Sequence, residues 1–126
     1  MGFRSKAELE AKALRMQEYL ELEIGPDPAQ IMERIEHLHI LIAQSGQCLA
    51  EAKYIQDQLI NQGLSAAIEM DLNKKLSPSL IAKFVSTQAK DINFIVNHLD
   101  RINAAATHQL DGLRSIISYK KAELNL

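Results

Sequence analysis

The sequence predicts an all-α protein, an elongated three-helix bundle in which a long antiparallel helical hairpin is joined by an additional N-terminal helix. Three observations support this fold class. Apolar residues recur every three or four positions along most of the chain. No stretch alternates between apolar and polar residues as a half-buried strand does. Signals that start or stop a helix are sparse and fall in three places.

The first helix is expected over residues 6–24. Ser5 and Glu8 have the spacing of a capping box, in which each side chain accepts a hydrogen bond from the backbone N–H of the other residue. Gly25 and Pro26 are expected to end the helix. Its apolar face would consist of Leu9, Ala13, Met16, Leu20 and Ile24.

The second helix is expected over residues 28–62. Asp27 suits the N-cap, and Pro28 suits the first helical position because its missing N–H has no partner there. Gly63 is the expected stop. Residues 65–74 are expected to form either a short further helix or an extension of the second helix. The apolar seam of the second helix comprises Ile31, Ile35, Leu38, Ile42, Ser45, Leu49 and Ala52.

The third helix is expected over residues 78–124, because Ser77 and Pro78 repeat the start signal and no later proline interrupts the chain. Gly112 is its one weak point. At 1.5 Å per residue, the second and third helices would be about 50 Å and about 70 Å long. If residues 63–77 form the apex of the hairpin, Ser45 and Gly46 are expected opposite Phe94.

Composition indicates one domain over residues 1–126 and excludes several functions. The 14 Lys and Arg residues are balanced by 16 Asp and Glu, so the excess positive charge of a nucleic-acid-binding surface is missing. The single cysteine, Cys48, has no partner for an internal disulfide. No apolar run approaches the ~20 residues of a membrane span, and the charged N-terminus does not resemble a signal peptide. We therefore expect a cytoplasmic protein that contacts neither membrane nor nucleic-acid polymer.

The third helix has an apolar seam of its own, which runs through Ile81, Val85, Gln88, Ile92, Ile95, Leu99, Ile102, Ala106, Gln109, Leu113 and Ile116. Further apolar residues lie outside the seams of the second and third helices. Burial between subunits would explain them and predicts a homo-oligomer. The alternative is that the first helix and the apex segment cover them within one chain. The residues concerned are Leu41, Cys48, Ile55, Phe84, Phe94 and Ile117.

Motifs for catalysis are not found. The sequence contains no glycine-rich phosphate loop, nucleophile elbow or paired-cysteine metal site. Glu36 and His39 have the Glu-x-x-His spacing of carboxylate-bridged metal centres, but the second such motif is missing. We therefore predict that the protein is not an enzyme and that it binds neither a metal ion nor a cofactor.

Residues 97–115 are rich in side chains that form directed hydrogen bonds. Asn97 and Arg101 are one helical turn apart, and Arg114 lies seven residues beyond Thr107 on the same face. Arginine combined with asparagine and threonine suits an anionic, hydroxylated ligand. Gln109 falls on the apolar seam, where it could set the register or belong to a pocket. The alternative for the whole stretch is an exposed polar face with no ligand.

A family resemblance rests on residues 49–54 and on residues 101–103 and 107–115. These stretches resemble small helical proteins encoded by phages and prophages, and the hairpin architecture resembles the anti-Thoeris and anti-CBASS sponge proteins. The resemblance implies a non-catalytic oligomer that sequesters a cyclic nucleotide or a cyclic ADP-ribose-type signal in the host cytoplasm. It also implies that Asn97 and Arg114, with Arg101 and Thr107 beside them, meet the ligand phosphates.

Two functional hypotheses follow. The first is the sponge, an oligomer that sequesters a nucleotide-derived immune signal. The second is a structural or adaptor protein that acts through helix–helix contacts with other protein chains. Few aromatic residues are present, 5% of the chain, so few rings could stack on a base.

Overall fold

The computed structural model describes residues 2–74 and 77–124, and all their regular secondary structure is helical. The all-α class is therefore confirmed. The predicted count of three helices is wrong, because the third predicted helix is divided in two. Residues 2–74 and 77–124 form four helices, namely α1 (Lys6–Glu21), α2 (Pro28–Lys74), α3 (Pro78–Gln88) and α4 (Lys90–Leu124).

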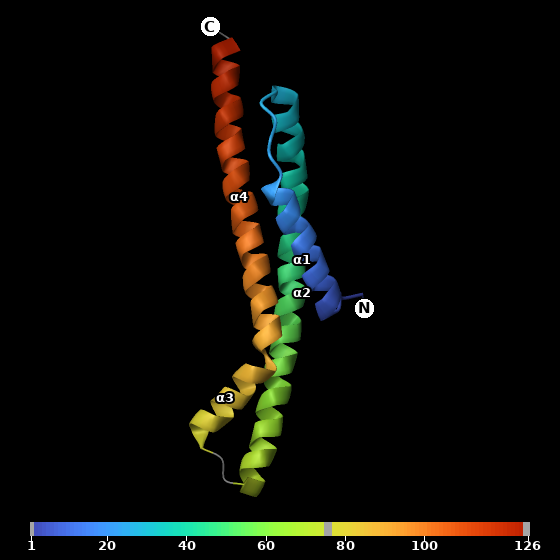
Figure 1. The fold of residues 1–126 in the computed structure, drawn as a ribbon, viewed down its shortest axis with the longest axis vertical. Coiled ribbons are helices and arrows are strands. Elements are labelled where there is room, and N and C mark those ends of the chain that lie inside the picture. Colours follow the sequence, from blue (N-terminus) through green and yellow to red (C-terminus); the bar gives the residue numbers. More distant parts are fainter. Residues whose placement is uncertain (1, 75–76, 125–126) are drawn as a thin grey trace.

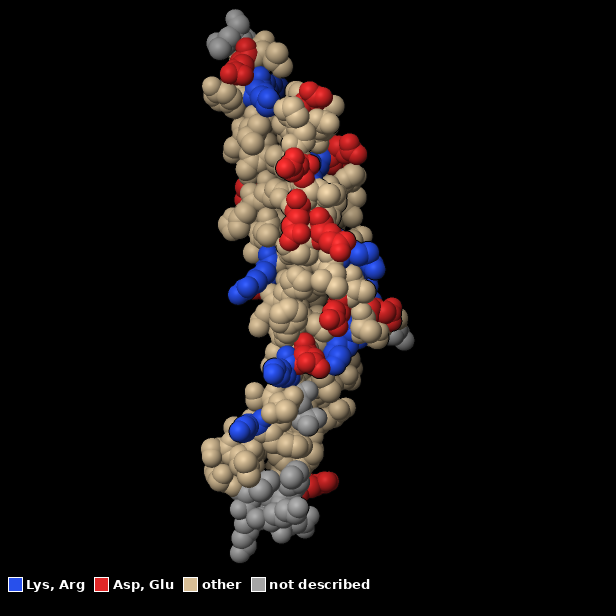
Figure 2. All heavy atoms as spheres, viewed as in Figure 1, with Lys and Arg blue, Asp and Glu red and all other residues tan. Residues whose placement is uncertain are grey.

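The molecule is a slender rod built on α2 and α4, which lie side by side and run in opposite directions (Figure 1). The short helix α1 packs against both of them near the middle of the rod. Toward the end of the rod at which α2 finishes, α3 diverges from α2 (Figure 1). Charged side chains of both signs are scattered along the face of the rod seen in Figure 2. None of the helices in the described residues is long and apolar enough to span a membrane.

The predicted helix starts are confirmed at Ser5 and Ser77. Ser5 Oγ accepts a hydrogen bond from the Glu8 N–H at 3.2 Å, and Glu8 Oε1 accepts one from the Ser5 N–H at 3.3 Å. Ser77 Oγ accepts a hydrogen bond from the Leu80 N–H at 3.3 Å. The first helix ends at Glu21, three residues before the predicted boundary at residue 24, and the Leu22 N–H bonds to the Tyr19 carbonyl there.

Helix α2 does not stop at Gly63 but continues to Lys74. Residues 65–74 therefore extend the second helix, and the boundary at residue 62 is wrong. A glycine inside a helix costs only about 1 kcal/mol relative to alanine. Gly63 is buried, and the fully buried Ala67 follows it by one turn. The conformation of residues 75–76 lies outside the described residues.

The third predicted helix is interrupted at Ala89, where neither proline nor glycine is present. The Ala89 backbone has φ −101° and ψ 3°, and its N–H bonds to the carbonyls of Ser86 and Thr87. Thr87 Oγ1 also donates to the Lys83 carbonyl at 2.9 Å, a local hydrogen bond that bends helices. Helix α4 starts one residue later and continues through Gly112 to Leu124.

Polar contacts define the register between α2 and α4. Asn103 Nδ2 donates to Ser45 Oγ at 2.9 Å, and Gln56 Nε2 donates to Asn93 Oδ1 at 2.6 Å. Ser45 therefore faces Asn103, and the expectation that it faces Phe94 is wrong. The apex lies further along the chain than expected because α2 continues beyond Gly63, and Phe94 is 66% exposed.

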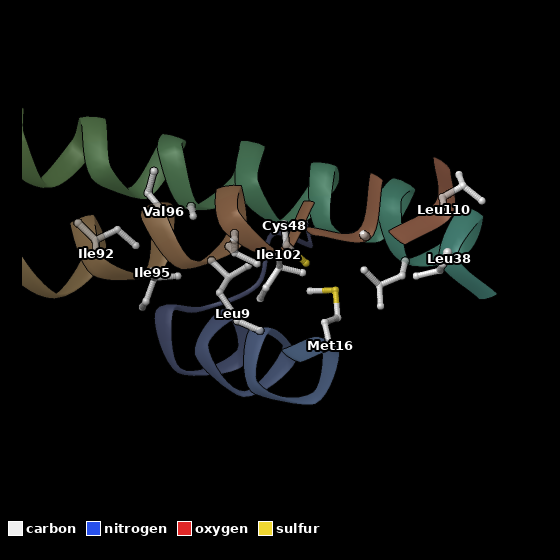
Figure 3. Packing of buried hydrophobic residues seen from close by; sticks show 14 of the residues in the cluster. Leu9, Met16, Leu38, Cys48, Ile92, Ile95, Val96, Ile102 and Leu110 are labelled. Atoms are coloured by element: carbon white, nitrogen blue, oxygen red, sulfur yellow. The ribbon is translucent and has the colours of Figure 1, made fainter. Parts of the chain in front are cut away.

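The core is continuous along the three helices that form the rod (Figure 3). Leu41 and Cys48 belong to this core and are buried within the single chain. Their burial therefore does not need a second subunit. Burial raises the pKa of the Cys48 thiol. The largest fully buried hydrophobic side chains are Leu9, Leu38, Cys48, Ile92, Leu99 and Ile102.

A pair of substitutions on α4 tests this core. Ile102 is fully buried, so Ile102→Ala is expected to lower the free energy of unfolding by about 3 kcal/mol, through lost burial and a residual cavity. Phe94→Ala, at an exposed position on the same helix, should change it by less than about 1 kcal/mol. Urea denaturation followed by circular dichroism measures both, and equal losses would contradict the assigned faces.

Candidate functional site

The ligand-binding residues predicted on α4 are not gathered in one place. Asn97 and Arg101 are exposed, whereas their neighbours Leu99 and Ile102 are fully buried on the opposite side of the helix. Thr107 and Arg114 are also exposed and lie on a different face. Asn97 and Arg114 are separated by about 25 Å along the helix axis.

Thr107 and Arg114 already have partners within the chain. Thr107 Oγ1 donates to the Asn103 carbonyl at 2.9 Å. Arg114 Nη2 donates to His39 Nε2 at 3.2 Å, which requires the histidine tautomer protonated at Nδ1. The structure thus brings Arg114 to α2 but does not place it near Asn97 or Arg101. A ligand-binding role for these four residues remains a prediction.

The polar seam residue Gln109 is explained by Arg34, which sequence reasoning did not single out. Arg34 is 6% exposed, and its Nε donates to Gln109 Oε1 at 2.7 Å. Arg34 Nη2 donates to the Leu20 carbonyl at 3.1 Å, at the C-terminal end of α1. This cation therefore joins three helices. The three-residue spacing from Ile31 could have placed it on the buried face of α2.

Tyr19 completes this cluster. The Arg34 guanidinium carbon lies 4.3 Å from the centre of the Tyr19 ring, a cation–π contact. The Tyr19 hydroxyl is 3.0 Å from His37 Nδ1. Burial raises the pKa of the Tyr19 hydroxyl, and the positive charge of Arg34 opposes part of that rise. The cluster fixes α1 on the hairpin through groups that satisfy one another.

A second polar cluster attaches the segment before α1 to α2. Glu51 is 4% exposed and receives hydrogen bonds from the Arg4 N–H and Arg4 Nη1, both at 2.8 Å. Gln47 Nε2 donates to the same carboxylate at 3.1 Å. The Arg4 backbone hydrogen bond is the main cause that lowers the pKa of Glu51. Phe3 packs edge-on against Tyr54 beside this ion pair, with ring centres 5.3 Å apart.

A groove of about 640 Å³ lies between α2 and α3. We call it the α2/α3 groove. Its walls are mainly apolar, and Ala89 and Asn93 lie where α3 meets α4. Leu64 on its α2 wall is 45% exposed. The groove is lined by Ile60, Leu64, Pro78, Ile81, Ala82, Val85, Ser86, Ala89 and Asn93.

Apolar side chains are also exposed at the opposite end of the rod. The last turns of α4 extend beyond the start of α2 (Figure 1). We call residues 116–124 the C-terminal end of α4. Ile116 is 45% exposed, Tyr119 69% and Leu124 82%. Exposed apolar side chains of the described residues therefore lie at both ends of the rod.

Metal ligands do not converge within the part of the chain that the structure describes. No group of three or more His, Cys, Asp or Glu side chains is arranged to hold an ion there. Of the Glu36 and His39 motif, the histidine contacts Arg114. Every buried side-chain nitrogen and oxygen of the described residues has a hydrogen-bond partner.

Comparison of the chain with protein-family models, with curated proteins and with solved structures finds no match.

Glu51→Gln is expected to destabilise the protein by about 2 kcal/mol at neutral pH, because it removes the buried carboxylate that accepts three hydrogen bonds. Since folding lowers the pKa of Glu51 from its ordinary value of 4.5, its stabilisation is complete above that pH and disappears as the pH falls through the native pKa. Urea denaturation at several pH values measures this, with the exposed Glu18→Gln as control. A difference from wild type that persists unchanged in strong acid would contradict it.

Gln109→Leu is expected to cost about 1–2 kcal/mol, because it leaves Arg34 Nε buried without its acceptor. The double variant Arg34→Met with Gln109→Leu should lose less than the sum of the two single variants, since it removes both polar partners. Urea denaturation of all four proteins gives the coupling energy. Additive losses would show that the two side chains do not stabilise each other.

Proposed function

We propose that this protein is a non-catalytic structural or adaptor protein that acts through helix–helix contacts. In our proposal the α2/α3 groove of one copy receives the C-terminal end of α4 from a second copy. The observation that carries this proposal is the open apolar groove between two diverging helices. Packed helices have their axes 8–10 Å apart, so two helices that diverge beyond this distance leave a groove in which a third helix can pack.

The proposed occupant has the matching chemistry. Ile116 and Tyr119 lie one turn apart on α4, and both are exposed. Packing them against the groove residues Leu64 and Ile81 would remove apolar surface of both copies from water, at about 25 cal/mol per Å². Basic side chains at Lys120 and Lys121 would keep the rim of this contact solvated.

The positions of the two surfaces suit a closed dimer. Helix α3, which supplies one wall of the groove, lies toward one end of the rod, and the C-terminal end of α4 lies at the other (Figure 1). If two rods lie side by side in opposite directions, each helix end comes beside the groove of the other copy. A two-fold axis then relates the two contacts, so both form in one dimer. Such an assembly is closed and does not grow into fibres.

The second hypothesis from the sequence, sequestration of a nucleotide-derived signal, receives less support from the single chain. Arg114 is bonded to His39, and Asn97 and Arg101 lie on another face. Binding of a cyclic dinucleotide or a cyclic ADP-ribose isomer that raises the melting temperature by several degrees would favour the sponge instead.

Size-exclusion chromatography with light scattering tests the proposed contact. The wild type is expected to be a dimer at micromolar concentration, and Leu64→Asp in the groove or Tyr119→Asp at the helix end should each produce monomers. Both replaced side chains are exposed, at 45% and 69%, so the chain should still fold. Leu14→Asp is the matched control, because Leu14 is 52% exposed and lies outside both surfaces.

A charge-pair variant gives a stricter test of the same contact. Leu64→Asp combined with Tyr119→Lys in one chain should restore the dimer, since each new carboxylate would face a new ammonium group of the other copy. A wild-type monomer would overturn self-association. A wild-type dimer that both single substitutions leave intact would assign the dimer contact to another surface.

A further inference from the structure

A second hollow lies between α1 and α2, on a different part of the rod from the α2/α3 groove. It has a volume of about 260 Å³. Its apolar residues are Met16 and Leu41, which are 5% and 6% exposed, and Ile40, which is 56% exposed. Met16 and Leu41 form the floor of the hollow and belong to the hydrophobic core, whereas Ile40 forms a solvent-exposed wall. We call this hollow the α1/α2 pocket.

Two of the residues that line the pocket carry positive charge. Lys12 and Arg15 are one turn apart on α1, and both line the pocket. None of the eight lining residues is an aspartate or glutamate. Neither Lys12 nor Arg15 forms an ion pair with another described residue, although Arg4 and Lys6 nearby in the sequence both do. Two cations therefore border an apolar surface without compensating carboxylates.

The charge of Lys12 also acts on the core. Burial raises the pKa of the Cys48 thiol, the charges of Arg4 and Lys12 oppose part of that rise, and the charge of Glu51 adds to it. On the α2 side, Gln44 supplies an amide, and His37 is held by the Tyr19 hydroxyl at 3.0 Å. These groups offer further hydrogen-bonding partners opposite the two cations.

We propose that the α1/α2 pocket binds a small amphipathic anion, with an apolar body and one carboxylate, sulfonate or phosphate group. The body would lie on Met16, Ile40 and Leu41, and the anionic group would meet Lys12 and Arg15 at the rim. Arginine can bind such a group through two parallel hydrogen bonds, and lysine adds a point charge. A volume of about 260 Å³ restricts the body to a short alkyl chain or a small ring system.

The pocket's charge preference is tested by isothermal titration calorimetry of the full chain with three ligands that share an eight-carbon tail. Octanoate should bind, octan-1-ol should bind at least roughly tenfold more weakly, and octylamine should show no binding, because only the first complements the two cations. Equal affinity for octanoate and octylamine would overturn the proposal.

Two variants assign the binding to this pocket. Lys12→Gln with Arg15→Gln should weaken octanoate at least roughly tenfold while leaving octan-1-ol unchanged, because only the charge is removed. Lys53→Gln with Lys83→Gln removes two exposed cations outside the pocket and should leave octanoate binding at the wild-type level. If the control weakens octanoate as much as the pocket variant does, the attraction is a general effect of charge and the proposal fails.

A third variant tests the apolar wall. Ile40→Trp places a larger side chain at a position that is already 56% exposed, so it should fill the pocket and abolish octanoate binding without lowering the melting temperature. Unchanged octanoate binding in this variant would place the ligand elsewhere.

The same chemistry could come from a lipid surface instead of a free anion. Sedimentation with vesicles of phosphatidylcholine and phosphatidylglycerol separates these sources. The proposal expects octanoate to bind and the vesicles to sediment without the protein. Co-sedimentation that depends on Lys12 and Arg15, without binding of octanoate, would overturn the pocket in favour of a membrane-facing surface.

Discussion

The packing of α2 against α4 along one apolar seam is the constraint on which the rest of the structure depends. Helices of this length gain most of their stability in proteins from such a face and little from intrinsic propensity. Leu38 on α2 and Leu99 and Ile102 on α4 are fully buried in the shared core. An apolar seam alone tolerates sliding by a turn, so the register needs directed contacts. Asn103 with Ser45 and Arg34 with Gln109 supply them, because a slip would leave buried polar groups unpaired.

The helical class and most helix starts were predictable because they depend on local chemistry. Ser5 with Glu8, and Ser77 before a proline, act over one turn and are visible in any window of the sequence. The continuation of α2 through Gly63 was not predictable, because tertiary packing around the buried Gly63 and Ala67 outweighs a propensity of about 1 kcal/mol. The break at Ala89 carries no proline or glycine, and it depends on hydrogen bonds of Ser86 and Thr87 that have no clear sequence signal.

The candidate site shows the same division between local and long-range information. The polar character of residues 97–115 was evident, but periodicity alone did not show that Gln109 would meet a buried arginine on another helix 75 residues away. Nor could spacing reveal the two hollows, since each needs two helices that the chain brings together over long separations. The burial of Arg34 and Glu51 is hard to predict because charged residues are rarely buried, although their spacing from Ile31 and Cys48 places them on inward faces.

The break at Ala89 also has a mechanical consequence. One residue separates α3 from α4, so the angle between these helices is set by the backbone torsions at that point. Helix α3 spans 11 residues, so a rotation of only ~10° there would displace its far end by about 3 Å. The width of the α2/α3 groove therefore depends on the backbone torsions at Ala89 as well as on the packing of α2 against α4.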